Sequence, residues 1–123
     1  MTTYRAIVLE HFRRPKNRGR LENANAESEG ANPLCGDRIR VQAEVCDGVV
    51  REARFTADAC ALCIASASML TEHVRGMTVE AAGAVGQEAI HRMLEGTPPP
   101  ARTRCVTLPV ETLRRALGEF MER

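Results

Sequence analysis

A cysteine and an aspartate stand two residues apart in the stretch 32–37, whose sequence is NPLCGD. Thiolate sulfur and carboxylate oxygen are both metal donors, so Cys35 and Asp37 could bind one ion. Pro33 fixes one backbone angle, and Gly36 permits a backbone path that a side chain would forbid. The stretch is therefore predicted to be a tight turn that aims Cys35 and Asp37 at a common point.

Two later cysteines are expected to converge on this turn. Cys60 lies in or beside the first turn of an expected helix, with Asp58 as the expected N-cap, and Cys105 lies just ahead of a C-terminal helix. Helix N-termini lower thiol pKa values and favour anions. Three thiols with Asp37 therefore suit a soft cation such as Zn²⁺, or an iron-sulfur cluster.

A predicted β-hairpin would bring Cys60 back toward Cys35. Apolar residues alternate with polar ones along the outgoing strand, Asp47 and Gly48 form a hairpin turn, and the chain then returns antiparallel. Residues 21–31 are expected to contain a short edge strand. The inward side chains are predicted to be Ile39, Val41, Ala43 and Val45 on the outgoing strand and Val49, Ala53 and Phe55 on the returning one.

Helices are predicted on both sides of the hairpin. Residues 3–14 form an amphipathic helix with Thr3 as N-cap and Pro15 as its stop. Residues 60–75 form a nearly all-apolar, buried helix that Gly76 ends. The region that Thr78 caps is expected in two pieces, broken around Gly83 and Gly86, and Pro109 is expected in the first turn of the C-terminal helix.

Composition is that of an ordinary globular chain, with 123 residues, 44% hydrophobic, 27% charged and a net charge of +1. One domain, residues 1–123, is expected. The charge is too balanced to suggest nucleic acid, and no charged-then-apolar leader pattern or long apolar run suggests export or a membrane, so neither is expected. Five scattered cysteines favour reduced thiols over a disulfide framework. These features predict a cytoplasmic protein.

The remaining two cysteines have weaker cases. Cys46 is placed at the far end of the hairpin and is interpreted as a bystander. Cys63 completes a C-x-x-C sequence with Cys60, which is typical of a redox pair or half of a zinc site. On a helix the two lie near the same side, so Cys63 could join the site or fill core space as a small hydrophobe. The three histidines are expected to be surface or satisfied residues.

Three blocks of sequence resemble one known family. The NPLCGD block around Cys35, the helix start at Cys60 with ASAS at 65–68 and LTE at 70–72, and Cys105 with Leu108 are similar to the iron-sulfur cluster scaffold family of IscU, SufU and the NifU N-terminal domain. The order and spacing of the blocks agree, and the opening helix through Pro15, Asn17 and Gly19 also fits. The resemblance covers essentially the whole chain.

The resemblance implies an α+β fold of the SufE/NifU-like kind, with a small three-stranded antiparallel sheet covered by about four to six helices. It implies a ligand set of Cys35, Asp37, Cys60 and Cys105 at one exposed end. Cys63 falls where relatives commonly have serine, which favours the bystander interpretation.

The function that follows is a scaffold, not an enzyme in the usual sense. It would accept sulfur from a cysteine desulfurase, with Cys35 and Cys105 as candidate persulfide acceptors. It would assemble a transient cluster, expected to be 2Fe-2S, and pass it to apo iron-sulfur proteins. Asp37 would be the weak, hard ligand that keeps the cargo exchangeable.

Two departures from the family pattern leave alternatives open. Arg104 stands where IscU-type members carry a histidine, and it cannot serve as a ligand. The extra stretch of SufU-type members is absent, and residues 98–102 lack the apolar anchors that a dedicated chaperone reads in IscU, so chaperone binding is not expected. The alternatives are a zinc-bound sulfurtransferase that activates a cysteine desulfurase, using the same four ligands, and a degenerate homologue that only binds partners.

Overall fold

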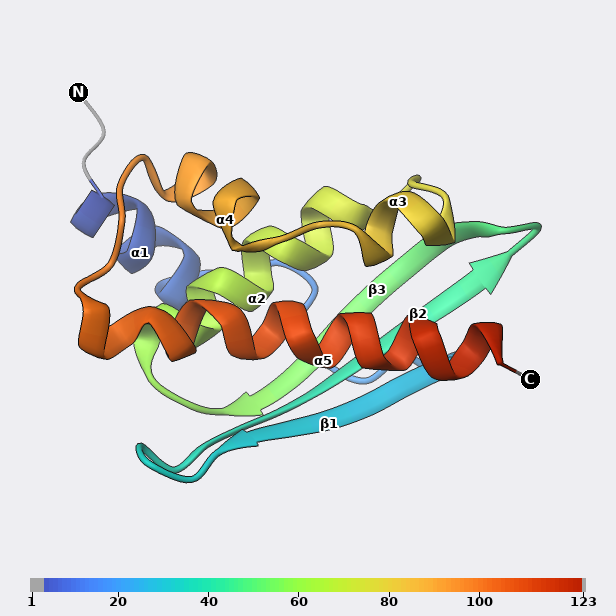
Figure 1. Cartoon of the computed structure of the whole chain (residues 1–123), viewed down its shortest axis with the longest axis horizontal. Coiled ribbons are helices and arrows are strands. Elements are labelled where there is room, and N and C mark those ends of the chain that lie inside the picture. The colour runs from blue at the N-terminus through green and yellow to red at the C-terminus, as the bar shows by residue number, and fades with distance from the viewer. Residues whose placement is uncertain (1–3, 123) are drawn as a thin grey trace.

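The chain forms a three-stranded antiparallel sheet with helices packed on one of its faces (Figure 1). The computed structural model describes residues 4–122. The strands are β1 (Ala26–Asn32), β2 (Asp37–Cys46) and β3 (Val49–Asp58), in the order β1-β2-β3. This α+β architecture confirms the predicted fold class, including the edge position of β1.

Five α-helices occur in the described part of the chain. They are α1 (Tyr4–Arg13), α2 (Ala61–Val74), α3 (Val79–Gly83), α4 (Gln87–Leu94) and α5 (Thr103–Met121), with a 3-10 turn at Pro100–Arg102. The predicted break between Gly83 and Gly86 is confirmed, because α3 ends at the first glycine and Gly86 caps α4. Thr78 caps α3 by accepting the Ala81 N–H at 3.1 Å.

One hydrophobic core lies between the sheet and the helices. In Figure 1, α5 runs across β1 and β2, while α2 packs against β3, α1 and α5. The inward side chains of β2 alternate as predicted. Because aromatic residues are scarce, aliphatic side chains fill most of the interior. The largest fully buried side chains include Phe55, Leu70, Ile90, Leu94, Leu113 and Leu117.

The hairpin has the predicted turn, but one inward position on β3 was wrong. Asp47 and Gly48 both have positive φ, at 53° and 77°, as a two-residue turn that matches the strand twist requires. Glu44 pairs with Glu52 and Val45 with Val50, so β3 carries one extra residue in a bulge. The bulge shifts the alternation, and Val50 is buried where Val49 was expected.

Helix α5 lies close against the edge strand because β1 offers a glycine at the crossing. A Cβ atom on Gly30 would overlap the Thr112 hydroxyl and come within 3.0 Å of Leu108 Cδ1. Nearby, the Arg115 guanidinium donates to the Glu29 carbonyl at 2.6 Å. These contacts hold the middle of α5 over β1 at Glu29 and Gly30, a few residues before the turn with Cys35.

Three predicted helix starts need correction or lie outside the described residues. The N-cap of α2 is Cys60, and Asp58 instead ends β3. Helix α5 begins at Thr103, so Cys105 is its third residue and Pro109 its seventh. Pro109 was expected in the first turn of the helix. Because proline has no backbone N–H, the Cys105 carbonyl, four residues earlier, receives no hydrogen bond from position 109. Thr3, the predicted cap of α1, lies outside the described residues.

Candidate metal centre

Three segments far apart in sequence meet at one end of the fold. They are the β1–β2 connection, the link from β3 to α2, and the start of α5, all at the left in Figure 1. The β2–β3 pairing brings Asp58 opposite Arg38, so the returning strand ends beside the turn. The hairpin register thus produces the predicted convergence of these segments.

Cys35, Asp37 and Cys105 form the tightest group of potential ligands. One donor atom from each, two sulfurs and a carboxylate oxygen, lie within 4.8 Å of one another. A spacing of this size is close enough for one ion or a small cluster to contact all three atoms. The turn from β1 to β2 thus presents Cys35 and Asp37 to the same point, as predicted.

Asp37 is buried, with only 3% of its surface exposed. Its two carboxylate oxygens differ in their hydrogen bonding. Oδ1 accepts the backbone N–H of Cys60 at 2.9 Å, which caps the start of α2. Oδ2 is buried and finds no hydrogen-bond partner among the described residues. A buried carboxylate oxygen without a partner costs free energy, and such atoms are commonly satisfied by an ion.

Cys35 lies on the exposed tip of the same turn. Gly36 adopts a positive φ of 76°, and the Cys35 and Gly36 N–H groups both donate to the Asn32 carbonyl, which closes the turn. The neighbouring Asp37 carboxylate raises the pKa of the Cys35 thiol. Leu34, next to it, is 84% exposed. The turn therefore offers a thiol and an apolar side chain to an approaching molecule.

Cys60 lies beside this group without belonging to it. Its N–H donates to Asp37 Oδ1 at 2.9 Å, and its thiol is near enough to Cys105 to raise the pKa of that thiol. The structure thus brings three of the four predicted ligands into one group and places the fourth next to two of them. The capping link between Asp37 and Cys60 was not foreseen from the sequence, because it joins residues 23 positions apart.

The expected lowering of the cysteine pKa values by the helix starts was wrong for Cys105. This residue is 4% exposed, and burial, followed by the hydrogen bond and charge of Cys60, raises the pKa of its thiol to about 12. Desolvation disfavours the thiolate more than the first turn of α5 favours it. A bound cation would reverse this balance, since metal coordination removes the thiol proton.

A hydrogen bond that sequence reasoning missed fixes α5 to α2 next to the site. The Ser66 hydroxyl donates to the Val106 carbonyl at 2.9 Å, and both residues are buried. This contact lies one residue from Cys105 and one to two helical turns from Cys60. The sequence did not indicate which serine of α2 would bind α5.

All five cysteines are free. Cys46 is exposed at the other end of the hairpin, as predicted, and is remote from the site. Cys63, the third residue of α2, is fully buried in the core. Burial and then the charge of Asp37 raise the pKa of the Cys63 thiol far above its ordinary value. Cys63 is therefore a buried thiol next to the site and lies outside the group of closest donor atoms.

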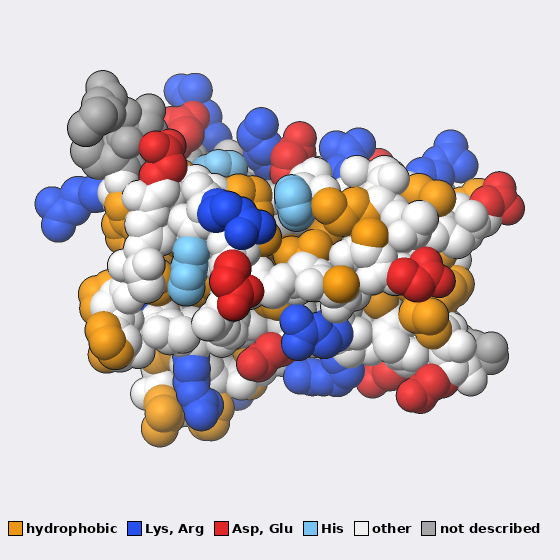
Figure 2. Space-filling model, turned by 45° about the horizontal axis from the view of Figure 1, so that its top comes forward, with side chains coloured by type: hydrophobic (Ala, Val, Ile, Leu, Met, Phe, Trp, Pro, Cys, Tyr) orange, Lys and Arg blue, Asp and Glu red, His pale blue; other side chains and the backbone are white. Residues whose placement is uncertain are grey.

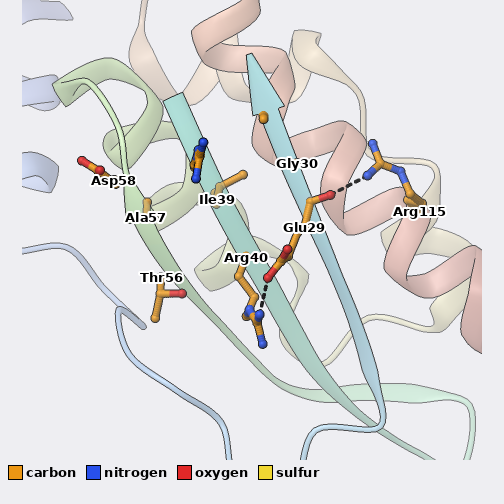
Figure 3. Close-up of a pocket in the computed structure, with 10 residues that line it drawn as sticks. Glu29, Gly30, Ile39, Arg40, Thr56, Ala57, Asp58 and Arg115 are labelled. Atoms are coloured by element: carbon orange, nitrogen blue, oxygen red, sulfur yellow. Dashed lines mark hydrogen bonds and ion pairs between the residues drawn. The ribbon is translucent and has the colours of Figure 1, made fainter. Parts of the chain in front are cut away.

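The remaining surface offers no rival site of comparable chemistry within residues 4–122. A shallow hollow on the outer face of the sheet is lined by Arg38, Arg40, Thr56 and Asp58. Arg40 is already paired with Glu29, as Figure 3 shows, and also with Glu27. Positive and negative side chains are interspersed over the face in Figure 2. No helix of the described chain is long and apolar enough to cross a membrane.

Comparison with known proteins agrees with this geometry. The family model described as the NifU-like N terminal domain matches residues 3–123. The iron-sulfur cluster assembly scaffold protein IscU of Aquifex aeolicus is 37% identical over 96% of this chain and 76% of its own length. The zinc-dependent sulfurtransferase SufU of Bacillus subtilis is 30% identical over 96% of this chain and 91% of its own.

A solved structure shares the fold. The N-terminal part of a nitrogen-fixing NifU-like protein from Brucella abortus superposes with a TM-score of 0.80, covering 99% of this chain and 96% of that one. Its sequence identity is 24%, so this likeness concerns the fold.

Proposed function

The chain belongs to the family of NifU-like N-terminal domains, the iron-sulfur cluster assembly scaffolds and their SufU relatives, and from this premise we propose that it assembles a transient cluster on its own cysteines. The cluster is cargo, expected to be 2Fe-2S, and the protein acts as a scaffold more than as an enzyme. Its ligands would be Cys35, Asp37, Cys60 and Cys105.

One observation carries this proposal: buried Asp37, whose Oδ2 has no hydrogen-bond partner among the described residues, has a carboxylate oxygen within 4.8 Å of the Cys35 and Cys105 sulfurs. The carboxylate is held by its other oxygen on the start of α2, so it does not have to be reorganised to bind iron. Two thiolate sulfurs supply soft donors, and the Cys60 thiol is close enough to Cys105 to supply a third.

The chemistry divides between the two kinds of donor. Thiols accept sulfur as persulfides and bind iron as thiolates, and Cys35 and Cys105 are the proposed acceptors. Cys35, on the exposed tip, can meet the persulfide of a donor protein directly. A carboxylate is a hard donor that matches the cluster poorly, so Asp37 would be the first ligand to exchange when the cluster is handed on.

The proposed partners are a cysteine desulfurase and apo iron-sulfur proteins. The exposed Leu34 side chain offers each of these partners an apolar contact beside the Cys35 thiol. We place the protein in the cytoplasm, where thiols stay reduced. The single core spanning the sheet and helices supports one domain over residues 1–123.

A second candidate is a zinc-bound sulfurtransferase that activates a cysteine desulfurase. Arg104 favours it, because a site without the neighbouring histidine is left with three cysteines and one aspartate, a set that suits tetrahedral zinc. The zinc-dependent relative at 30% identity points the same way. In this case one thiolate would leave the metal to accept the sulfur.

Metal and sulfide analysis distinguishes the two. The purified chain is made metal-free and reconstituted without oxygen with iron and sulfide, in the presence and absence of an equal amount of zinc. Labile sulfide together with bound iron is the result expected of a scaffold. Zinc that survives excess iron, with no labile sulfide, would favour the sulfurtransferase. Neither cargo would indicate a homologue that only binds partners.

A further inference from the structure

Cys60 and Cys63 are the two ends of a C-x-x-C sequence at the start of α2. Cys60 is the N-cap, with extended backbone angles of φ −68° and ψ 164°, and it is partly exposed. Cys63 is the third residue of the helix and fully buried. A partly exposed thiol at a helix N-terminus, followed by a buried thiol three residues later, is the arrangement of dithiol–disulfide active sites.

The two thiols are placed to form a disulfide with a small movement. Side chains three apart on a helix have Cβ atoms about 5–6 Å apart, and a disulfide needs about 3.5–4.5 Å. Cys60 is not inside the helix, and its side chain makes no capping hydrogen bond, so it can rotate toward Cys63. Only the N-cap has to move.

Cys63 is also close to the candidate ligands. Asp37 and the thiols of Cys60, Cys105 and Cys35, when ionised, lie near enough to raise the pKa of the Cys63 thiol. Burial and these negative groups keep Cys63 protonated, so it does not compete with the other cysteines for a cation. Cys63 is therefore a buried thiol next to the site. Metal binding does not require it as a donor, and any small apolar side chain could supply its packing.

We propose that Cys63 is a resolving thiol that releases sulfide from a persulfide on Cys60, a step that rests on the proposed function. A persulfide accepted at Cys105 first passes its outer sulfur to the neighbouring Cys60 thiol, which leaves Cys105 as a thiol. The Cys63 sulfur then attacks Cys60 Sγ. The S–S bond of the persulfide breaks, the Cys60–Cys63 disulfide forms, and H₂S leaves with the proton of Cys63.

This step balances and supplies what cluster assembly needs. The transferred sulfur atom arrives at the S⁰ level and leaves as sulfide, which requires two electrons. The Cys60 and Cys63 thiols provide these electrons by becoming a disulfide. The sulfur comes from a cysteine persulfide of the donor, and a dithiol reductant of the thioredoxin class returns the disulfide to two thiols. The cluster requires sulfide, so the step converts the delivered oxidation state into the usable one.

The test uses the full chain, reduced and metal-free, mixed with one equivalent of glutathione persulfide without oxygen. Sulfide is measured over time, and the protein is alkylated and digested with trypsin. Cleavage after arginine leaves Cys60 and Cys63 together in peptide 55–75, whereas Cys35, Cys46 and Cys105 fall in peptides 21–38, 41–51 and 105–114. An internal disulfide therefore makes one peptide 2 mass units lighter, and a Cys60–Cys105 disulfide joins two peptides.

In the parent chain we expect sulfide and the lighter 55–75 peptide to appear together in equal amounts. In Cys63→Ser, and in Cys63→Ala as a second variant that needs no new hydrogen bond, we expect a persistent persulfide. Sulfide release should fall by at least about tenfold, because a neighbouring thiol greatly outperforms one from solution. Cys46→Ser, changed on the exposed far end of the hairpin, is the matched control and should behave like the parent.

Release that is unchanged in both Cys63 variants would overturn the inference, and so would a Cys60–Cys105 disulfide as the product. Reconstitution with iron and inorganic sulfide bypasses the step, so both Cys63 variants should still form a cluster. If neither they nor the parent do, the proposed function fails. If all of them do while release stays unchanged, only the resolving role of Cys63 fails.

Discussion

Asp37 and Cys60 are joined by a 2.9 Å hydrogen bond from the Cys60 N–H to Oδ1, while Oδ2 of the same carboxylate remains without a partner. One side chain therefore both caps α2 and keeps a free oxygen, while a carboxylate oxygen of the same residue lies within 4.8 Å of the Cys35 and Cys105 sulfurs. The cap holds the carboxylate in place, and the free oxygen is available to iron. This division between the two oxygens allows a ligand to be weak and still be well positioned.

Replacing Asp37 separates these two tasks. Asp37→Asn keeps an oxygen that can accept the Cys60 N–H but removes the charge, whereas Asp37→Ala removes both. We expect cluster transfer to an apo-ferredoxin to slow in both variants, because the exchangeable ligand is lost, and the cluster to persist longer on the scaffold. Transfer is timed by the change in visible circular dichroism.

The helix cap is checked in the same two proteins by urea unfolding. Asp37→Ala lacks the acceptor and should be less stable than Asp37→Asn by about 1 kcal/mol. Faster loss of the cluster from Asp37→Asn would contradict the role of Asp37 as the exchangeable ligand. Weakened zinc retention in a protein that never forms a cluster would support the sulfurtransferase instead.

The close crossing of β1 and α5 predicts a strong effect at one glycine. In Gly30→Ala the new Cβ would overlap the Thr112 hydroxyl, so α5 must shift away from the sheet. We expect a loss of about 1–3 kcal/mol in the free energy of unfolding. The control is Gly118→Ala on the same helix, where nothing lies within 4 Å of the new Cβ and a gain of about 0.5–1 kcal/mol is expected. Equal effects in urea unfolding would contradict the packing argument.

His11 predicts a pH dependence of stability. Its Nδ1 lies 2.8 Å from the Ser68 hydroxyl, which accepts the Lys16 N–H, and burial and then the charge of Lys16 lower the pKa of the imidazole. The unfolded chain therefore binds more protons than the folded one in this range. Stability is complete above the unfolded pKa and is lost as the pH falls from about 7 to about 5.

Urea unfolding at both pH values measures this contribution. His11→Asn should lose less stability on acidification than the parent, whereas His73→Gln, at an exposed position, should lose as much as the parent. An unchanged pH dependence in His11→Asn would show that the half-buried imidazole is not responsible.

The parts of the structure that the sequence predicted correctly depend on local chemistry. Asp47 and Gly48 adopt the positive φ angles of the hairpin turn, Gly83 and Gly86 separate two helices, and the turn with Gly36 presents Cys35 and Asp37 together. In each case a few neighbouring residues determine the backbone. The approach of Cys60 and Cys105 then followed from hairpin length and chain direction.

The errors and omissions depend on contacts between distant segments. The bulge that buries Val50 is set by pairing with β2, where the Asn25 side chain bonds both the N–H and the carbonyl of Val45. Asp37 replaced Asp58 as the partner of the α2 start because the turn lies next to it in space. The raised pKa of Cys105 reflects burial by the whole fold, which outweighs the local helix terminus.

Arg104 provides a test of the ligand set. It is the exposed second residue of α5, beside Cys105, and lines a small hollow with Asn32 and Glu111. Arg104 directly precedes Cys105 in the chain, so a donor at this position would lie next to the ligand. Arg104→His should add a nitrogen donor and lengthen the half-life of a bound cluster. Arg104→Gln removes the charge without adding an imidazole, so an equal half-life in the two variants would remove the ligand argument.

Single cysteine replacements test which thiols hold the cargo. Cys35→Ser, Cys60→Ser and Cys105→Ser should each weaken metal binding by at least about tenfold, because each removes a soft donor from a small set. Cys46→Ser and Cys63→Ser should bind as the parent does, since the first is remote and the second is a buried, protonated thiol. Zinc competition against a chromogenic chelator measures all five, and cobalt spectra report the number of thiolates.

Cys60 is the informative member of this series, because its sulfur lies next to the closest group of donors without belonging to it. A thiolate-to-cobalt charge-transfer band that weakens in Cys60→Ser as much as in Cys35→Ser would make Cys60 a ligand once the metal is bound. A band that stays at parent intensity would leave only Cys35, Asp37 and Cys105. If Cys63→Ser lost metal as completely as Cys60→Ser, the second helix would contribute a different thiol from the one proposed.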